Sequence, residues 1–226
     1  MTLHLTIEKL QSLRLNGMVK ALDEQIQQGH YNDLTFDERL THLVERETII
    51  RENRRLKTRL TKAKLKQDAA IEDIDFTFPR GLERQSLLEL SHCEWVKAHR
   101  NILVVGPTGT GKTYLACALA HKACLEGYNV LYKRMPRLMP ELIIAKGDGS
   151  YTKRMNEIAK SDVLILDDWG LLPLESEHRR DLLEILDERH ERGSVIITSQ
   201  LPLKLWNETI NDSTLADAIL DRVIHN

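Results

Sequence analysis

Eight consecutive residues combine glycine, lysine and threonine at a spacing that can wrap phosphate groups. The segment GPTGTGKT fits the pattern G-x-x-x-x-G-K-[ST] at every fixed position. Glycines let the backbone curl so that its N–H groups point at phosphate oxygens, and a helix starting here adds the positive end of its dipole. The lysine can reach the β- and γ-phosphates, and the threonine hydroxyl can hold Mg²⁺. We therefore expect a nucleotide site at Gly106, Pro107, Thr108, Gly109, Thr110, Gly111, Lys112 and Thr113.

The alternative interpretation of this segment is an ordinary glycine-rich turn. At an average glycine content of about 7%, a chance match is expected in roughly one chain per hundred of this length. An apolar run precedes the segment, and the apolar helical pattern YLACALAHKA follows it. This strand–loop–helix context is the one that a phosphate loop requires, and it favours nucleotide binding.

Two aspartates at the end of a second apolar run predict what is done with the nucleotide. In DVLILDDWG, Asp167 can bind Mg²⁺, usually through water, and Asp168 can orient or deprotonate the attacking water. Taken alone, such a pair is equally often a turn or a helix cap. Here it follows a phosphate loop with one strand candidate between them, which is typical of P-loop ATPases that separate the two motifs in the sheet.

A third apolar run, SVIITSQ, ends in polar residues. A polar side chain at this point can sit beside the γ-phosphate and report its loss, although by themselves these residues mark only the passage from strand to loop. The candidates are Thr198, Ser199 and Gln200, and we assign the catalytic part to Ser199.

The candidate site residues must be positioned by a fold, and the hydrophobic pattern predicts that this fold is an α/β domain. Apolar runs indicate strands at Ile102–Val105, Asn129–Lys133, Val163–Leu166 and Ser194–Thr198. Helical patterns separate them, at 112–126, 136–146, 151–160 and 176–191. Such alternation predicts a parallel sheet sandwiched by helices.

The front of the chain has a helical pattern instead. One helix is expected after Thr6 as its N-cap and ends near Gly29, and a second begins at Thr35 with Glu38 closing a capping box. We therefore expect a small all-helical domain over residues 1–68, and the ATPase domain over 69–226, beginning with the linker AAIEDIDFTFPRG.

The bulk composition is that of a folded globular protein, with 226 residues, 42% of them hydrophobic and 29% charged. No apolar run approaches the roughly 20 residues that cross a bilayer, and MTLHLTIEKL lacks the pattern of a secretory signal. We expect a cytoplasmic protein without a membrane contact. The three cysteines and nine histidines lack metal-ligand spacing, and packing is the favoured role of Cys117 and Cys124.

Positive charge is concentrated between Arg51 and Lys66, where eight Lys or Arg residues face a single acid. The run has no aromatic residue, so it suits contacts to DNA phosphates rather than base reading. The alternative is a solvated helix face. A second basic cluster follows the second core strand. We predict contacts to double-stranded DNA from Arg51, Arg54, Arg55, Lys57, Arg59, Lys62, Lys64, Lys66, Lys133, Arg134 and Arg137.

The order of these motifs resembles that of AAA+ ATPases in the DnaA/DnaC-type initiator and loader branch. The chain is most similar to IstB-type transposition helper ATPases of bacterial insertion sequences. The segments that carry the likeness are LRLNGMVKALDEQ, IEDIDF, ILVVGPTGTGKTYLACALA, DVLILDDWGLLPL and SVIITSQLPLKLW. A replicative helicase loader, distinguished by its N-terminal domain, and a small-molecule kinase are the alternatives. Against the kinase stand the Asp–Asp strand end and the lack of a basic substrate lid.

The resemblance implies slow, DNA-stimulated hydrolysis of ATP with Mg²⁺, binding of duplex DNA, and assistance to a cognate transposase. It also implies homo-oligomers with ATP between subunits, in which Arg222 is an arginine finger for the neighbouring site. Two features depart from the pattern. Asp168 replaces the Glu that is usual in AAA+ proteins at large, so we expect slow hydrolysis. The sequence ends at Asn226, before a second nucleotide sensor, so we expect a truncated chain.

Overall fold

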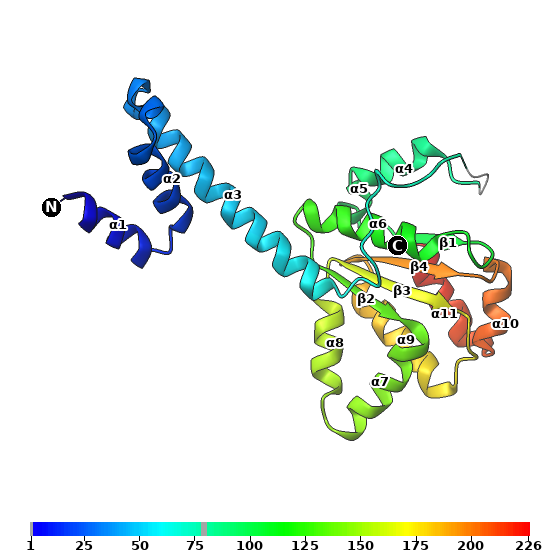
Figure 1. Cartoon of the computed structure of the whole chain (residues 1–226). Helices are drawn as coiled ribbons and strands as arrows, with labels where there is room; N and C mark the ends of the chain where they lie inside the picture. Colours follow the sequence, from blue (N-terminus) through cyan, green and yellow to red (C-terminus); the bar gives the residue numbers. More distant parts are fainter. Residues whose placement is uncertain (1, 78–80) are drawn as a thin grey trace. The chain divides into compact units, whose positions relative to one another are not determined.

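The computed structural model describes residues 2–77 and 81–226 (Figure 1). The chain divides into two compact units, Met1–Thr58 and Arg59–Asn226. Helix α3 (Phe36–Ala63) contains the division. This point precedes the domain boundary expected at residue 68, and that boundary stays a prediction.

The first unit consists of α1 (Thr2–Ser12), α2 (Asn16–Gln27), the 3-10 helix η1 (Gly29–Asp33) and most of α3. The prediction of a single helix that begins after Thr6 is wrong. Thr6 lies inside α1, and the helix is interrupted between Ser12 and Asn16, where α2 begins. Arg14 takes a left-handed conformation with φ of 58°, which ends α1. The buried Glu47 carboxylate of α3 then accepts the Gly17 and Met18 N–H groups, at 2.6 and 3.2 Å, so that a new helix starts there.

The expected capping box at the start of α3 is confirmed. The Thr35 backbone N–H donates to the Glu38 carboxylate at 2.8 Å, and the Glu38 N–H donates back to the Thr35 hydroxyl at 3.4 Å. These two bonds satisfy donors that the first turn of the helix leaves without intrahelical partners.

The second unit is built on a parallel sheet of four strands in the order β1-β4-β3-β2. The strands are β1 (Ile102–Val105), β2 (Val130–Arg134), β3 (Val163–Trp169) and β4 (Ser194–Ser199). The predicted α/β architecture is confirmed, and β4 is the strand that separates the phosphate-loop strand from the aspartate strand. Because all four are parallel, their carboxyl ends meet at one edge of the sheet, where the polar residues gather.

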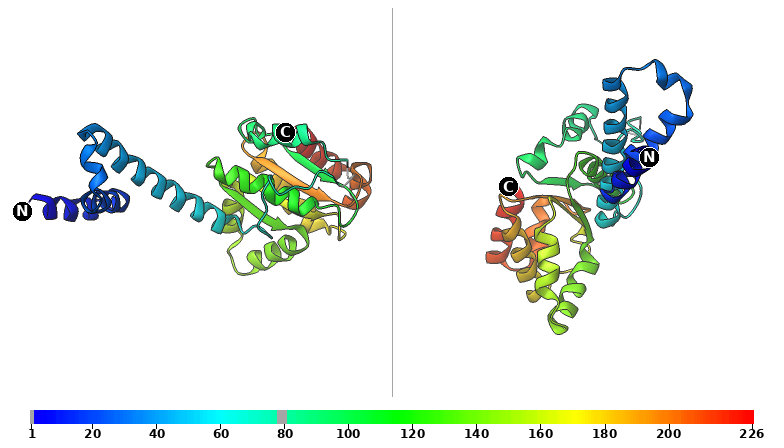
Figure 2. Two further views of the ribbon diagram at one scale, coloured as in Figure 1. Left: turned by 45° about the horizontal axis from the view of Figure 1, so that its top comes forward. Right: turned by 90° about the vertical axis from the view of Figure 1, so that its left-hand side faces the viewer.

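Helices cover both faces of this sheet (Figures 1 and 2). The helices of this unit are α4 (Arg84–Ser91), α5 (Glu94–Lys97), α6 (Lys112–Leu125), α7 (Met135–Gly147), α8 (Tyr151–Ala159), α9 (Ser176–Arg189), η2 (Leu203–Leu205), α10 (Trp206–Ile210) and α11 (Ser213–Ile224). The main core lies under α7–α11 and includes Leu164, Leu166 and Ile197. On the other face α6 buries small residues, Cys117 and Cys124 among them as expected, which lets it lie close to the strands.

Candidate active site

The predicted phosphate loop joins β1 to α6. Gly109 and Gly111 have φ of 83° and 86°, a left-handed conformation in which a side chain is strained. Helix α6 begins at Lys112, so its first N–H groups face the loop. The Lys112 ammonium folds over the loop and donates to the Pro107 carbonyl at 2.8 Å. The loop therefore has the backbone curl and the cation that phosphate binding requires.

The loop is also joined to the end of β4. The Gly106 N–H donates to the Ser199 carbonyl at 3.1 Å. The Thr108 hydroxyl donates to the Gln200 side-chain carbonyl at 2.7 Å. Among the three polar residues predicted to lie beside the γ-phosphate, Gln200 is therefore the one whose side chain contacts the phosphate loop.

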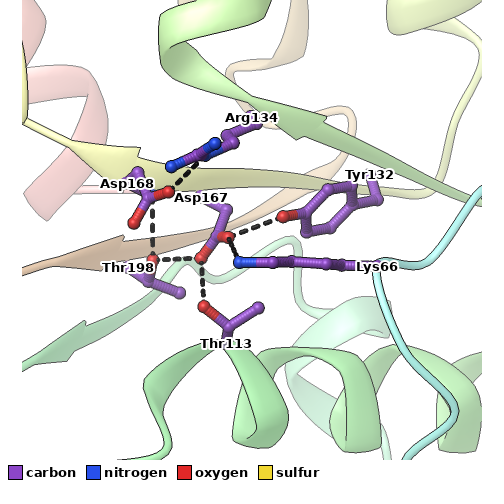
Figure 3. Close-up of polar contacts among 7 residues, drawn as sticks. All are labelled: Lys66, Thr113, Tyr132, Arg134, Asp167, Asp168 and Thr198. Atoms are coloured by element: carbon purple, nitrogen blue, oxygen red, sulfur yellow. Dashed lines mark hydrogen bonds and ion pairs between the residues drawn. The ribbon is translucent and has the colours of Figure 1, made fainter. Parts of the chain in front are cut away.

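Asp167 is the centre of a cluster of polar contacts at the end of β3 (Figure 3). One carboxylate oxygen, Oδ1, accepts hydrogen bonds from the hydroxyls of Thr113 at 2.9 Å and Thr198 at 2.6 Å. The other, Oδ2, accepts one from the Tyr132 hydroxyl at 2.6 Å and lies 3.7 Å from the Lys66 ammonium. Burial by itself would raise the pKa of the fully buried Asp167, but these hydrogen bonds and the Lys66 charge outweigh it and lower that pKa. The carboxylate is therefore held as an anion.

The residues around Asp167 fit the magnesium ion that a phosphate loop implies. A threonine hydroxyl and an ionised carboxylate oxygen are hard oxygen donors of the kind that Mg²⁺ prefers, and Thr113 and Asp167 present them 2.9 Å apart. Thr113 and Asp167 are the two residues that the sequence predicted as Mg²⁺ ligands.

Asp168 follows in an unusual backbone conformation. Its φ is 63°, and the β3–β4 register is irregular between Leu166 and Trp169. Its backbone N–H donates to the Thr198 hydroxyl at 3.1 Å, and its carboxylate forms an ion pair with Arg134 of β2 (Figure 3). One threonine hydroxyl thus fixes both aspartates, since it accepts from one residue and donates to the other.

Ser199 is not brought to the carboxylates. Its buried hydroxyl donates to the Trp169 carbonyl at 3.0 Å and accepts from the Leu201 N–H at 3.0 Å. Side chains alternate across a strand, so Thr198 and Ser199 extend to opposite faces of β4. In this geometry Thr198, rather than Ser199, is the β4 residue that bonds to the aspartates, and the catalytic role assigned to Ser199 stays a prediction.

A cavity of about 500 Å³ opens beside the phosphate loop. Gly111, Lys112 and Leu115 line one part of it, and Ile74 and Leu82 line another. Its volume lies in the range of small-molecule sites. Sequence reasoning treated the segment containing Ile74 as a linker and missed this wall. The apolar residues within IEDIDF were the available signal, and residues 78–80 of the segment lie outside the described part of the chain.

Arg222 lies on α11, and its side chain is partly exposed. The guanidinium donates to Asp187 at 2.9 Å and to Asp221 at 2.7 Å. Both partners belong to the same chain, and the finger role of Arg222 stays a prediction.

The structure separates the predicted DNA contacts into two groups. Arg51, Arg54, Arg55 and Lys57 belong to the first unit, where Arg51 pairs with Glu47 at 2.6 Å. The others belong to the second unit, and some have partners that the sequence did not indicate. Arg59 donates to the Cys124 carbonyl at 3.0 Å, Lys64 lies 3.7 Å from Glu157, and Lys133 pairs with Glu141 at 2.9 Å. Lys62 and Arg137 are exposed.

Residues from the two predicted basic clusters meet around one cavity of about 680 Å³. Lys64 and Lys66 come from the segment after α3, and Arg134 comes from the end of β2. Its charged lining is Lys64, Lys66, Lys133, Arg134, Arg137, Arg154 and the single acid Glu141. Sequence reasoning named all of these cations but Arg154, yet gave no sign that they share a cavity or that two of them contact the aspartates.

The sequence pattern of the family described as IstB-like ATP binding protein matches residues 8–226. The chain belongs to this family. It is 48% identical to y4pL of Sinorhizobium fredii, named as an insertion sequence ATP-binding protein, over all of this chain and 92% of that one. It is 33% identical to the ATP-binding protein of insertion sequence IS21 from Pseudomonas aeruginosa, over 96% of this chain and 82% of that one.

Solved structures of other proteins share the fold of this IstB-like chain. The crystal structure of DnaI has a TM-score of 0.58 at 24% identity, covering 69% of this chain and 86% of that one. The DnaC helicase loader has a TM-score of 0.54 at 20% identity, covering 71% and 93%. The predicted AAA+ core and the family resemblance are confirmed. Within the described residues, every helix is too short or too polar to span a membrane.

Proposed function

We propose that this chain is a DNA-binding ATPase that assists the transposase of an insertion sequence. One observation carries the proposal: the Asp167 carboxylate, at the end of β3, is hydrogen-bonded both to Thr113 of the phosphate loop and to Thr198 of β4. The two halves of a nucleotide-hydrolysing site are thereby in contact. The insertion-sequence names of relatives that match the whole chain support the biological role.

The proposed mechanism assigns each residue a place around ATP. Backbone N–H groups of the loop and the Lys112 ammonium bind the β- and γ-phosphates, and the cavity beside the loop takes the nucleoside. Thr113 and Asp167 would hold Mg²⁺, which when bound would neutralise negative charge on the phosphate oxygens. Asp168 orients the attacking water, and Gln200, bonded to the loop through Thr108, reports the γ-phosphate.

Phosphate release with and without duplex DNA tests this function. Lys112→Ala should remove ATP binding and hydrolysis, because no other side chain of the loop carries a positive charge to the phosphates. Lys122→Ala, at the opposite end of the same helix α6, is the matched control and should behave as the parent. Unchanged ATP affinity in Lys112→Ala would refute the assignment of the site.

We propose that the basic residues contact the DNA backbone, with the helical region of residues 1–68 as the main binding domain. Arg54, Arg55, Lys57 and Lys62 are exposed on α3. Neutralising all four should weaken binding to unrelated duplexes by similar factors and should lower the slope of log K against log salt. A loss confined to one sequence would indicate base readout and contradict the proposal.

We also propose that ATP lies between subunits and that Arg222 is donated to a neighbouring site. Arg222→Ala should then leave ATP binding by the isolated subunit intact while abolishing hydrolysis. Mixing it with Lys112→Ala should restore hydrolysis above the level of either variant, because one subunit supplies the loop and the other the finger. Mixed assemblies without any recovery would place the action of Arg222 within its own subunit.

A further inference from the structure

One oxygen of the Asp167 carboxylate, Oδ2, is held by a tyrosine that belongs to none of the predicted motifs. The Tyr132 hydroxyl donates a hydrogen bond to it at 2.6 Å (Figure 3). The Lys66 ammonium lies 3.7 Å from the same oxygen, which is too far for a hydrogen bond. Among the residues that the structure describes, Tyr132 is therefore the only side chain that hydrogen-bonds to Oδ2.

The register of the sheet explains why Tyr132 reaches this carboxylate. In the pairing of β2 with β3, Tyr132 lies opposite Ile165, two residues before Asp167. Residues two apart in a strand extend to the same face of the sheet, and so do neighbours in register. Tyr132 and Asp167 therefore share the face that α6 covers, where Thr113 also bonds to the carboxylate. A phenylalanine at position 132 would fill the same space without offering a donor.

The donors around Asp167 divide its two oxygens between them. Oδ1 accepts from the hydroxyls of Thr113 and Thr198, and Oδ2 accepts from Tyr132. The terminal torsion of an aspartate is soft, so the direction of each oxygen depends on its partners. Asp167 has no exposed surface, so these partners belong to the protein and not to the solvent. A bond that fixes Oδ2 thereby keeps Oδ1 beside Thr113, where the two oxygens fit Mg²⁺.

We propose that Tyr132 is a positioning residue that directs Oδ1 of Asp167 toward the Mg²⁺ site beside Thr113 and so raises the affinity of that site for the ion. The inference rests on the proposed function, because it concerns the metal site of the same ATPase. The competing explanation is structural: a half-buried phenol bonds to the nearest acceptor, as buried tyrosines usually do. Both explanations predict lower stability without the hydroxyl. A changed Mg²⁺ dependence of nucleotide binding follows from the positioning role alone.

The test titrates Mg²⁺ into the whole chain mixed with a fluorescent ATP analogue, starting from EDTA. Tyr132→Phe removes only the hydroxyl. The Mg²⁺ concentration at which nucleotide binding is half-maximally tightened should rise about tenfold, the lower end for loss of a group that orients a metal ligand. The affinity in EDTA should equal that of the parent, because the phosphate loop is unchanged. In phosphate release, saturating Mg²⁺ should bring kcat back toward the parent value, whereas a damaged fold would not recover.

Tyr151→Phe is the matched control, because it also removes a phenol hydroxyl bonded to a buried aspartate. The Tyr151 hydroxyl of α8 lies 3.1 Å from Asp181 Oδ1 and 2.8 Å from a Glu184 carboxylate oxygen, both on α9. Urea unfolding of the nucleotide-free protein should show a lower midpoint for both variants. The Mg²⁺ dependence should change in Tyr132→Phe alone. An equal change in Tyr151→Phe would attribute the effect to general destabilisation and overturn the proposal.

A double variant shows whether Tyr132 acts through Asp167. In Asp167→Asn the charged acceptor is gone, so adding Tyr132→Phe should shift the Mg²⁺ midpoint by less than about twofold. A second full shift would contradict action through the carboxylate. A parent whose nucleotide affinity does not depend on Mg²⁺ would refute the metal site of the proposed function itself. A Mg²⁺-dependent parent with the same midpoint as Tyr132→Phe would refute this inference alone.

Discussion

Replacing Thr198 by valine tests which polar residue at the end of β4 serves the carboxylates. The valine has nearly the same shape and removes only the hydroxyl. In the parent that hydroxyl donates to Asp167 at 2.6 Å and accepts from the Asp168 N–H at 3.1 Å. Thr198 and Asp167 are both buried, so water cannot replace the bond between them.

The magnitude follows from these two bonds. A hydrogen bond to a charged group contributes about 1.5–3 kcal/mol, and an unsatisfied buried N–H costs about 1–3 kcal/mol. Because Asp168 is only partly buried, we expect the free energy of unfolding to fall by about 2–5 kcal/mol. If the whole free energy of the Thr198–Asp167 hydrogen bond stabilises the transition state and not the bound substrate, its loss lowers kcat by about 10- to 150-fold.

The assay combines urea unfolding with phosphate release. Tryptophan fluorescence follows unfolding, because the buried rings of Trp169 and Trp206 stack with centroids 4.7 Å apart next to the site. Ser199→Ala is the matched control, since its hydroxyl bonds only to backbone groups. It should lower stability by about 1–3 kcal/mol while kcat stays within about twofold. The reverse pattern, with Ser199→Ala inactive and Thr198→Val fully active, would refute the geometric reasoning and restore the catalytic role predicted for Ser199.

Four further measurements address stability, protonation and backbone conformation. Gly17→Ala should destabilise the first unit by about 1–3 kcal/mol in thermal unfolding, because its Cβ would lie 2.6 Å from the Glu47 Cα. Asp167 has a lowered pKa, so its carboxylate contributes stability above its unfolded pKa of about 3.9, and this contribution disappears as pH falls through the folded pKa. The difference in unfolding free energy between parent and Asp167→Asn should accordingly shrink below about pH 4, and a constant difference would contradict the shift. Burial raises the pKa of all three thiols, that of Cys124 to about 11, so a thiol reagent at neutral pH should modify them slowly unless urea is added. Asp168→Glu should lower the urea midpoint relative to Asp168→Asn, because glutamate adopts positive φ less readily than asparagine.

The sheet and its motifs were predictable because their signals are local. Strands β1, β3 and β4 are short apolar runs followed by a turn or a bend, whereas β2 passes directly into α7. The observed bounds differ from the expected ones mainly at the strand ends. The phosphate loop, likewise, is defined by residues that are adjacent in the sequence. Parallel topology then requires the polar strand ends to meet at one edge of the sheet.

The features that the sequence did not reveal depend on contacts between distant residues. The break between α1 and α2 is stabilised by Glu47, thirty positions after the N–H of Gly17 that it accepts. The choice between Thr198 and Ser199 depends on which face of β4 turns toward the aspartates. A strand that is buried on both faces carries no polar alternation from which to infer this.

The conformation of Asp168 accounts for its departure from the glutamate that AAA+ proteins commonly have. A non-glycine residue at φ of 63° costs on the order of 1–2 kcal/mol, and Asn and Asp tolerate this region better than longer side chains. The Thr198 hydroxyl accepts the N–H of this residue and Arg134 pairs with its carboxylate, so two contacts offset the strain. A shorter side chain in a strained turn holds its carboxylate close to the end of β3, within reach of a cation from β2. The same substitution that suggests slow hydrolysis thus places a carboxylate where Arg134 forms an ion pair with it.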